Sequence, residues 1–355
     1  MSRVRLSSLV LGATLVLLLV MLVTLRSTLL AAHLDEAIDY VASDAATYFS
    51  LYDGFYSDLD LAENPALFMI GSPILLMKLW NGNLFAIQMC NLVLMGISLK
   101  VAFNCFATQR GRLAFLAGAL AFPYFLFGFL SLNKEVYAMC SAIFFASYLM
   151  RGHRLHLATA LLLAACARYY MLIALLVLIP LIPRDGRPRY RLIAALLVGI
   201  SLAAPLVKVL VPGYSAEGLL EDSGALGPAF SKVVDSFGYA PLYPIKYLAL
   251  IPMRAYGLSI GSGRAADAME AVVSLTTIVM VAFATRILRG RKPPSAVVNR
   301  LIVAGFVAPI PIMWSEIMHW RYYSFVYFFF LFAVVVRYFD KRRSSTTPRT
   351  VSVDA

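Results

Sequence analysis

Residues 155–182 read LHLATALLLAACARYYMLIALLVLIPLI, one apolar run that is interrupted in its middle by a polar triplet starting at Arg168. Basic residues flank the run on both sides, within 151–154 and within 184–191. Because basic residues mark the cytoplasmic ends of membrane helices, one long helix would leave one flank on the wrong side. Two helices of about 13 residues that turn at Arg168 keep both flanks together, and each spans only about 20 Å. The turn would then lie below the outer surface, in a cavity where non-helical backbone is tolerated.

The composition of the whole chain also indicates a membrane protein. Of its 355 residues, 61% are hydrophobic and 14% are charged, and the mean hydropathy is +0.79. Soluble domains average about 45–50% apolar and about 25% charged residues, so a soluble enzyme, a disordered chain and a fibrous protein are excluded. The predicted fold class is therefore all-α, a polytopic integral membrane protein with about ten transmembrane helices, some of them broken or re-entrant.

The apolar runs and the basic clusters together predict a topology. The predicted spans lie at residues 6–25, 83–107, 113–131, 135–150, 155–167, 169–182, 192–211, 270–285, 301–315 and 322–338. The net charge is +12, and short basic clusters carry most of the 31 Lys and Arg residues. Assigning every cluster to the cytoplasm places both termini there. The short run at 65–80 contains two prolines and is interpreted as re-entrant or interfacial. If it crossed the membrane, the side of every later loop would reverse.

This topology predicts one transmembrane domain at residues 1–340 and a disordered cytoplasmic tail at 341–355. Two long segments, 32–64 and 212–269, remain on the outer side. The four cysteines lie inside apolar stretches without a CxxC spacing, so they predict buried thiols rather than disulfides or metal ligands.

The first outer segment, 32–64, holds eight of the chain's 19 acidic residues and no Lys or Arg. Six aromatic residues lie among these acids. Aromatic rings stack on the apolar face of a sugar, and carboxylates accept hydrogen bonds from its hydroxyls, so the pattern suits sugar binding. A solvated acidic loop with interfacial aromatics would give the same pattern.

Four basic residues are predicted at the outer face, Lys134, Arg168, Arg254 and Arg321. Three more are predicted further out on the same side, Lys232, Lys246 and Arg264. Positive charge there runs against the usual bias and therefore requires a partner. Arg binds phosphate oxygens bidentately and Lys acts as a point charge, so the set predicts a site for a lipid phosphate or pyrophosphate. Alternatively, each residue extends to lipid headgroups or forms an internal ion pair, such as Lys134 or Arg168 with Glu135.

The motifs of several other enzyme classes are absent from the sequence. The four histidines are scattered without a zinc motif, and neither nucleotide-binding loops nor a serine-hydrolase elbow occurs. His319 is a candidate base or sugar contact, and an interfacial hydrogen bond is the alternative. The acid-rich loop is compatible with a divalent metal, but we expect neither a metal site nor another cofactor.

The order of these features resembles that of bacterial lipid-dependent glycosyltransferases of the C-type (GT-C) fold. The likeness rests on Asp44-Ala-Ala-Thr-Tyr48, on the Pro-containing short segment that follows, and on Arg321-Tyr322 before the last span. It implies a GT-C-like fold in a bacterial inner membrane, with a first-loop carboxylate as the base that activates the acceptor hydroxyl. That role falls first on Asp44 and second on Asp53.

A narrower resemblance is to membrane-embedded exopolysaccharide and O-antigen polymerases, which rely on arginines around a lipid pyrophosphate. In several of them the polar break between two spans is Arg-Gln, whereas it is Lys134-Glu135 here. This departure makes Glu135 an acid/base candidate. The resemblance implies phosphate binding by the four outer basic residues. The residues expected to contact the substrate are Tyr48, Tyr169, His319 and Tyr322.

The function implied is that of an inverting glycosyltransferase or polysaccharide polymerase with a periplasmic active site. It would transfer a sugar or glycan from a polyprenyl phosphate or pyrophosphate donor to a glycan or lipid-linked acceptor, without nucleic acid. A transporter or flippase of a lipid-linked sugar or anion is the alternative, because buried charges also mark transport pathways. A non-catalytic scaffold is a further alternative. Long charged outer loops and the lack of a recognisable inverted repeat favour one-sided chemistry over transport.

Overall fold

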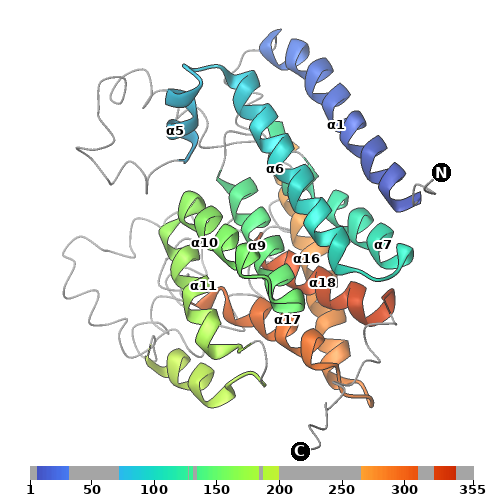
Figure 1. Cartoon of the computed structure of the whole chain (residues 1–355), viewed down its shortest axis with the longest axis vertical. Helices are drawn as coiled ribbons and strands as arrows, with labels where there is room; N and C mark the ends of the chain where they lie inside the picture. Colours follow the sequence, from blue (N-terminus) through green and yellow to red (C-terminus); the bar gives the residue numbers. More distant parts are fainter. Residues whose placement is uncertain are drawn as a thin grey trace, which may run out of the picture.

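The computed structural model describes residues 6–31, 72–126, 128–130, 134–183, 187–199, 265–310 and 324–340. Within these ranges every regular element is a helix and no strand occurs, which confirms the all-α prediction for this part of the chain (Figure 1). The helices are α1 (Leu6–Ala31), α5 (Ser72–Leu79), α6 (Leu84–Cys105), α7 (Gln109–Leu120), α8 (Pro123–Leu126), the 3₁₀ turn η1 (Gly128–Leu130), α9 (Glu135–Arg151), α10 (Arg154–Ala167), α11 (Tyr169–Leu181), an unlabelled helix (Tyr190–Gly199), α16 (Ala265–Arg289), α17 (Ala296–Val307) and α18 (Val326–Tyr338).

Two helices are long and apolar enough to cross a membrane by themselves. They are the Leu6–Thr24 part of α1, with a mean hydropathy of 2.7, and α6, with 1.7. Five other apolar helices in the described residues have only 10–17 residues. The structure therefore gives two candidate spans, while the other predicted spans remain predictions.

One predicted span differs clearly from the structure. The sequence predicts a single span at 113–131, but α7 ends at Leu120, and the chain continues through α8 and η1. Pro123 lacks the N–H that would extend the α7 ladder, and it is instead the first residue of α8, where proline is tolerated. One continuous helix over this range is therefore wrong, and its crossing of the membrane remains a prediction.

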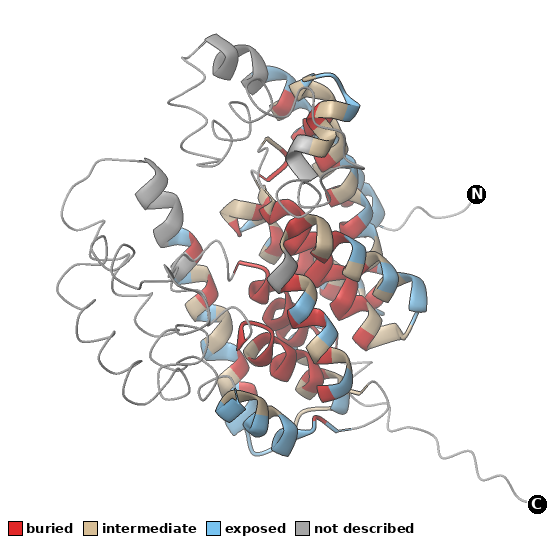
Figure 2. Ribbon diagram, turned by 90° about the vertical axis from the view of Figure 1, so that its left-hand side faces the viewer, coloured by how far each residue is buried: buried red, intermediate tan, exposed pale blue. Residues whose placement is uncertain are grey.

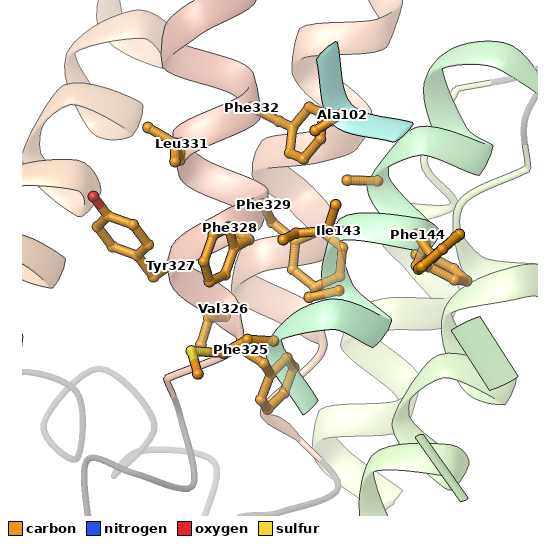
Figure 3. Packing of buried hydrophobic residues seen from close by; sticks show 14 of the residues in the cluster. Ala102, Ile143, Phe144, Phe325, Val326, Tyr327, Phe328, Phe329, Leu331 and Phe332 are labelled. Carbon is orange, nitrogen blue, oxygen red and sulfur yellow. The ribbon is translucent and has the colours of Figure 1, made fainter. Parts of the chain in front are cut away.

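The core is built around α18. Every residue from Val326 to Val336 is buried. A helix that is apolar on all faces requires neighbours on every side, and α7, α9, α16 and α17 all contact it. Figure 3 shows its phenylalanines packed towards Ala102 of α6 and Ile143 of α9. Figure 2 shows the buried residues gathered in the middle of the described helices.

Two glycines let neighbouring helices approach α18 closely. A Cβ atom added at Gly305 of α17 would lie 2.6 Å from Cε1 of Phe330, and one added at Gly118 of α7 would collide with Leu331. Small residues at helix contacts allow such close packing in membrane proteins. The positions of α7 and α17 against α18 therefore depend on glycine.

Short connections join several helices at one end of this assembly. The Asp340 carboxylate accepts hydrogen bonds of 2.9 Å from the backbone N–H groups of Ala107 and Thr108, so α18 ends where α7 begins. Arg337 donates to the carbonyl oxygen of Lys292 at 3.2 Å, which places the α16–α17 connection beside it. We call residues 106–112, 289–295 and 337–340 the basic end, because Arg110, Arg112, Arg289, Arg291, Lys292 and Arg337 lie there.

Helices α9 and α10 form a hairpin with charged residues at both of its ends. Gly152 ends α9 with φ 75°, a left-handed conformation that glycine adopts without strain, and α10 packs back along α9. Arg151 and Arg154 consequently lie at the turn. Glu135 and Arg168 lie together at the other end of the two helices.

Candidate functional site

The helix break at Arg168 is where the candidate site begins. α10 has 14 residues and α11 has 13, and Arg168 lies between them with φ −162° and ψ 137°. Its N–H bonds back to Ala164, and its carbonyl oxygen accepts from Met171 and Leu172. One extended residue thus caps both helices, and Figure 1 shows α11 returning from the break beside α10. The predicted break and the predicted helix lengths are confirmed.

The Arg168 side chain forms an ion pair with the first residue of α9. Its Nη2 atom lies 2.9 Å from Oε1 of Glu135, and the two side chains are 17% and 7% exposed. The carboxylate is in the first turn of α9, where the partial positive charge of the helix N-terminus also stabilises it. The structure therefore brings together two predicted site residues, in the internal ion pair that the sequence left open as an alternative to phosphate binding.

The pair shows which ligands the Arg168 guanidinium suits. Arg168 binds a carboxylate oxygen at the distance at which a guanidinium also binds phosphate oxygens. An anionic ligand that reached Arg168 would therefore compete with Glu135.

Three neutral polar residues near the start of α9 were not predicted from the sequence as site residues. The Tyr137 hydroxyl donates to Oδ1 of Asn91 at 3.1 Å, and Nε2 of Gln88 donates to the Leu130 carbonyl at 3.1 Å. Gln88, Asn91 and Tyr137 are 6%, 1% and 9% exposed. The first bond joins α6 to the first turn of α9, and the second joins α6 to η1. Only the polar letters at 88 and 91, inside an apolar run, could have indicated them.

Packing holds these elements in place. The Ser141 hydroxyl of α9 donates to the Ala160 carbonyl of α10 at 2.7 Å. A Cβ added at Gly128 of η1 would lie 2.8 Å from Cγ2 of Val136, so η1 fits tightly against the first turn of α9. These contacts fix the start of α9, and with it Glu135, relative to both α10 and η1.

The site lies away from the basic end. Asn91 of α6 bonds to Tyr137, and Phe106, the C-cap of α6, belongs to the basic end. The 15 residues between Asn91 and Phe106 correspond to about 22 Å along a helix. Six of the described basic residues lie at the basic end, and Arg151 and Arg154 lie at the α9–α10 turn, whereas Lys134 and Arg168 lie at the site.

The other predicted site residues are placed as follows. Lys134 is the N-terminal cap of α9, directly before Glu135. Tyr169 is the first residue of α11, but its side chain is outside the described part. The predicted residues that fall outside the described ranges are Asp44, Tyr48, Asp53, Arg254, His319, Arg321 and Tyr322. Within the described ranges, no group of three or more His, Cys, Asp and Glu residues is placed to hold a metal ion.

The chain matches no protein-family model, no curated protein and no solved structure. The resemblance to C-type glycosyltransferases therefore rests on the order of the short motifs in the sequence. The structural feature that bears on function is the partly buried ion pair at the helix break.

Proposed function

We propose that the chain is a multi-pass inner-membrane glycosyltransferase or polysaccharide polymerase that uses a polyprenyl phosphate- or pyrophosphate-linked sugar donor on the periplasmic side. The observation that carries the proposal is the partly buried Glu135–Arg168 pair at the helix break, remote from the basic end. Charged residues inside a membrane helix assembly are expensive and are usually functional. A guanidinium placed there is suited to the phosphate of a lipid-linked donor.

The distribution of charge supports this orientation. The basic end would face the cytoplasm, because cytoplasmic connections of membrane proteins carry the excess of Lys and Arg. The ion pair would then lie towards the periplasmic side. On α1, Leu9, Val16 and Leu17 are 57%, 61% and 60% exposed, which suits contact with lipid chains rather than water.

The proposed reaction is an inverting displacement at the anomeric carbon of the donor. An acceptor hydroxyl loses its proton to Asp44, or alternatively to Asp53, while its oxygen forms the new glycosidic bond. The bond from the anomeric carbon to the phosphate oxygen breaks, and the lipid phosphate leaves as an anion. Arg168, Arg321 and Lys134 stabilise that charge, and Glu135 holds Arg168 in position until the donor phosphate takes its place.

The test is a complementation experiment in the organism that carries the chain. The gene is deleted, surface glycans are separated on gels, and lipid-linked intermediates are identified by mass spectrometry. Variants Asp44→Asn, Arg168→Ala and Arg321→Ala, expressed at wild-type levels in the membrane, should fail to restore the glycan and should leave the lipid-linked donor unconsumed. Arg291→Ala at the basic end is the matched control and should restore it.

Two results would contradict the proposal. Full glycan synthesis by all three variants would remove the assigned roles. Accumulation of the lipid-linked sugar in the deletion strain, out of reach of a lectin added to spheroplasts, would identify transport across the membrane instead. In a transferase deletion the accumulated donor is accessible from outside but is not consumed.

A further inference from the structure

The side-chain amide of Gln88 has an NH₂ group that donates a hydrogen bond and an oxygen that can accept one. Its Nε2 atom faces the carbonyl oxygen of Leu130 at 3.1 Å. A carbonyl oxygen only accepts hydrogen bonds, so the atom facing it must be the NH₂ group, and this fixes the orientation of the amide. Oε1 consequently points the other way. It is buried, and among the described residues no donor lies within hydrogen-bonding distance of it.

This atom selects a particular kind of ligand. A buried carbonyl oxygen without a donor is unfavourable, and only a group with an O–H or N–H satisfies it. A fully ionised phosphate offers acceptors alone and would be repelled. A sugar hydroxyl is a donor, so it suits this oxygen.

The neighbouring residues extend the same chemistry. Asn91 lies three residues after Gln88, on the same face of α6, and Tyr137 bonds to it from α9. All three side chains are neutral, buried and able to bind hydroxyl groups. Glu135, which pairs with Arg168, and Tyr137 both belong to the first turn of α9, two residues apart.

We infer that Gln88, Asn91 and Tyr137 form a neutral subsite that binds hydroxyl groups of the sugar on the lipid-linked donor, while Arg168 binds its phosphate. This inference rests on the proposed function and adds the part of the site that recognises the sugar. Oε1 of Gln88 accepts a hydrogen bond from one sugar hydroxyl. The subsite should therefore affect the affinity for the sugar and leave the affinity for the bare lipid phosphate unchanged.

The experiment measures binding to the full-length protein in lipid nanodiscs by calorimetry. The probes are farnesyl phosphate and the farnesyl phosphate esters of glucose, galactose, mannose and N-acetylglucosamine. The wild type should bind at least one glycosylated probe about three- to tenfold more tightly than farnesyl phosphate, the range expected for a neutral hydrogen bond. Gln88→Met, which keeps the volume of the side chain, should remove this preference without changing the Kd of farnesyl phosphate.

Two further variants complete the test. Asn91→Leu should also remove the preference, so the result does not depend on one variant that folds poorly. Ser147→Ala is the matched control, because Ser147 is buried on α9 but bonds only within its own helix, to Ile143 at 2.8 Å. It should keep the preference for the sugar.

The outcomes separate the two proposals. If the wild type binds farnesyl phosphate but prefers no glycosylated probe, or if Gln88→Met keeps the preference, the subsite is overturned and the proposed function stands. In the second case a water molecule rather than a sugar satisfies Oε1. If the wild type binds none of the probes, both the subsite and the lipid-linked donor are overturned.

Discussion

The buried Glu135 carboxylate and the Arg168 guanidinium stabilise each other at 2.9 Å. Removing one partner costs the other this charged hydrogen bond, so Glu135→Gln and Arg168→Gln should each lower the free energy of unfolding by about 1.5–3 kcal/mol. The double variant Glu135→Gln/Arg168→Gln leaves no charge and should lose less than either single variant. Thermal unfolding of the purified full-length protein measures these differences.

The control for this pair is Arg168→Lys, which keeps the charge but not the planar fork. We expect an intermediate loss, because a Lys ammonium is a point charge on a longer stem. Additive losses in the double variant would show that the two residues act independently. That result would contradict a coupled pair and would weaken the assignment of Arg168 as the donor's phosphate ligand.

Sequence reasoning found part of this site. Arg168 interrupts an apolar run and Glu135 opens another, and a charge in such a position is visible in the sequence alone. Gln88 and Asn91 were missed, because their partners Leu130 and Tyr137 are 42 and 46 residues away along the chain. Tertiary packing decides such bonds. A single Gln or Asn in an apolar helix does not indicate which residue is its hydrogen-bond partner.

Helix contacts around α18 give a prediction at the scale of elements. Gly305→Ala in α17 would press a Cβ against the Phe330 ring, and overpacking of this kind destabilises by about 1–3 kcal/mol. Gly12→Ala in α1 is the matched control, because nothing lies within 4 Å of its Cβ position. That substitution should leave stability unchanged or raise it by up to about 1 kcal/mol, through the better helix propensity of alanine.

The two glycine variants are compared by thermal unfolding and by gel filtration in detergent. A lower Tm for Gly305→Ala with an unchanged or higher Tm for Gly12→Ala is the expected result. Equal changes in both variants would mean that helix propensity alone determines the effect. The close approach of α17 to α18 would then not be a feature of the folded protein.

The junction between α18 and α7 gives a second prediction at this scale. Each oxygen of the buried Asp340 accepts one backbone N–H, from Ala107 and Thr108. In Asp340→Asn one oxygen becomes an NH₂ group that cannot accept, so one buried N–H loses its partner and stability should fall by about 1–3 kcal/mol. Chemical denaturation of the purified protein gives this value.

Ser295→Ala is the control for the Asp340 junction. Ser295 caps α17, but its hydroxyl accepts from Val298 N–H at 3.4 Å, a long bond to a neutral group. Its loss should therefore be smaller, about 0.5–1 kcal/mol. Equal losses in the two variants would contradict the special contribution of Asp340.

The elements themselves were predictable to different degrees. The break at Arg168 was predicted, because two basic flanks and a central charge are incompatible with one membrane helix. The end of α7 at Leu120 was not, because the residues after it are as apolar as those before it, and only Pro123 marks the change. The Asp340 junction joins residues more than 230 positions apart, so no local sequence pattern predicts it.

At the scale of the whole molecule, we expect the two ends of the helix assembly to lie on opposite sides of the membrane. Gly290 lies in the α16–α17 connection at the basic end, which we expect in the cytoplasm. Leu79 ends α5 just before α6 begins, on the side of Gln88 and Asn91, and it is 69% exposed. We therefore expect Leu79 on the periplasmic side and Gly290 inside.

Cysteine labelling tests this arrangement in a variant whose four native cysteines are replaced by alanine. A membrane-impermeant maleimide should label Leu79→Cys in intact spheroplasts and Gly290→Cys only after the membrane is permeabilised. Ala160→Cys, fully buried on α10, is the control and should react only after denaturation. Labelling of both sites from outside would place α5 and the basic end on one side, so the chain before α6 or between α6 and α16 would cross the membrane differently. Labelling of Gly290→Cys alone would reverse the orientation, move the Glu135–Arg168 pair towards the cytoplasm and leave a periplasmic reaction without its site.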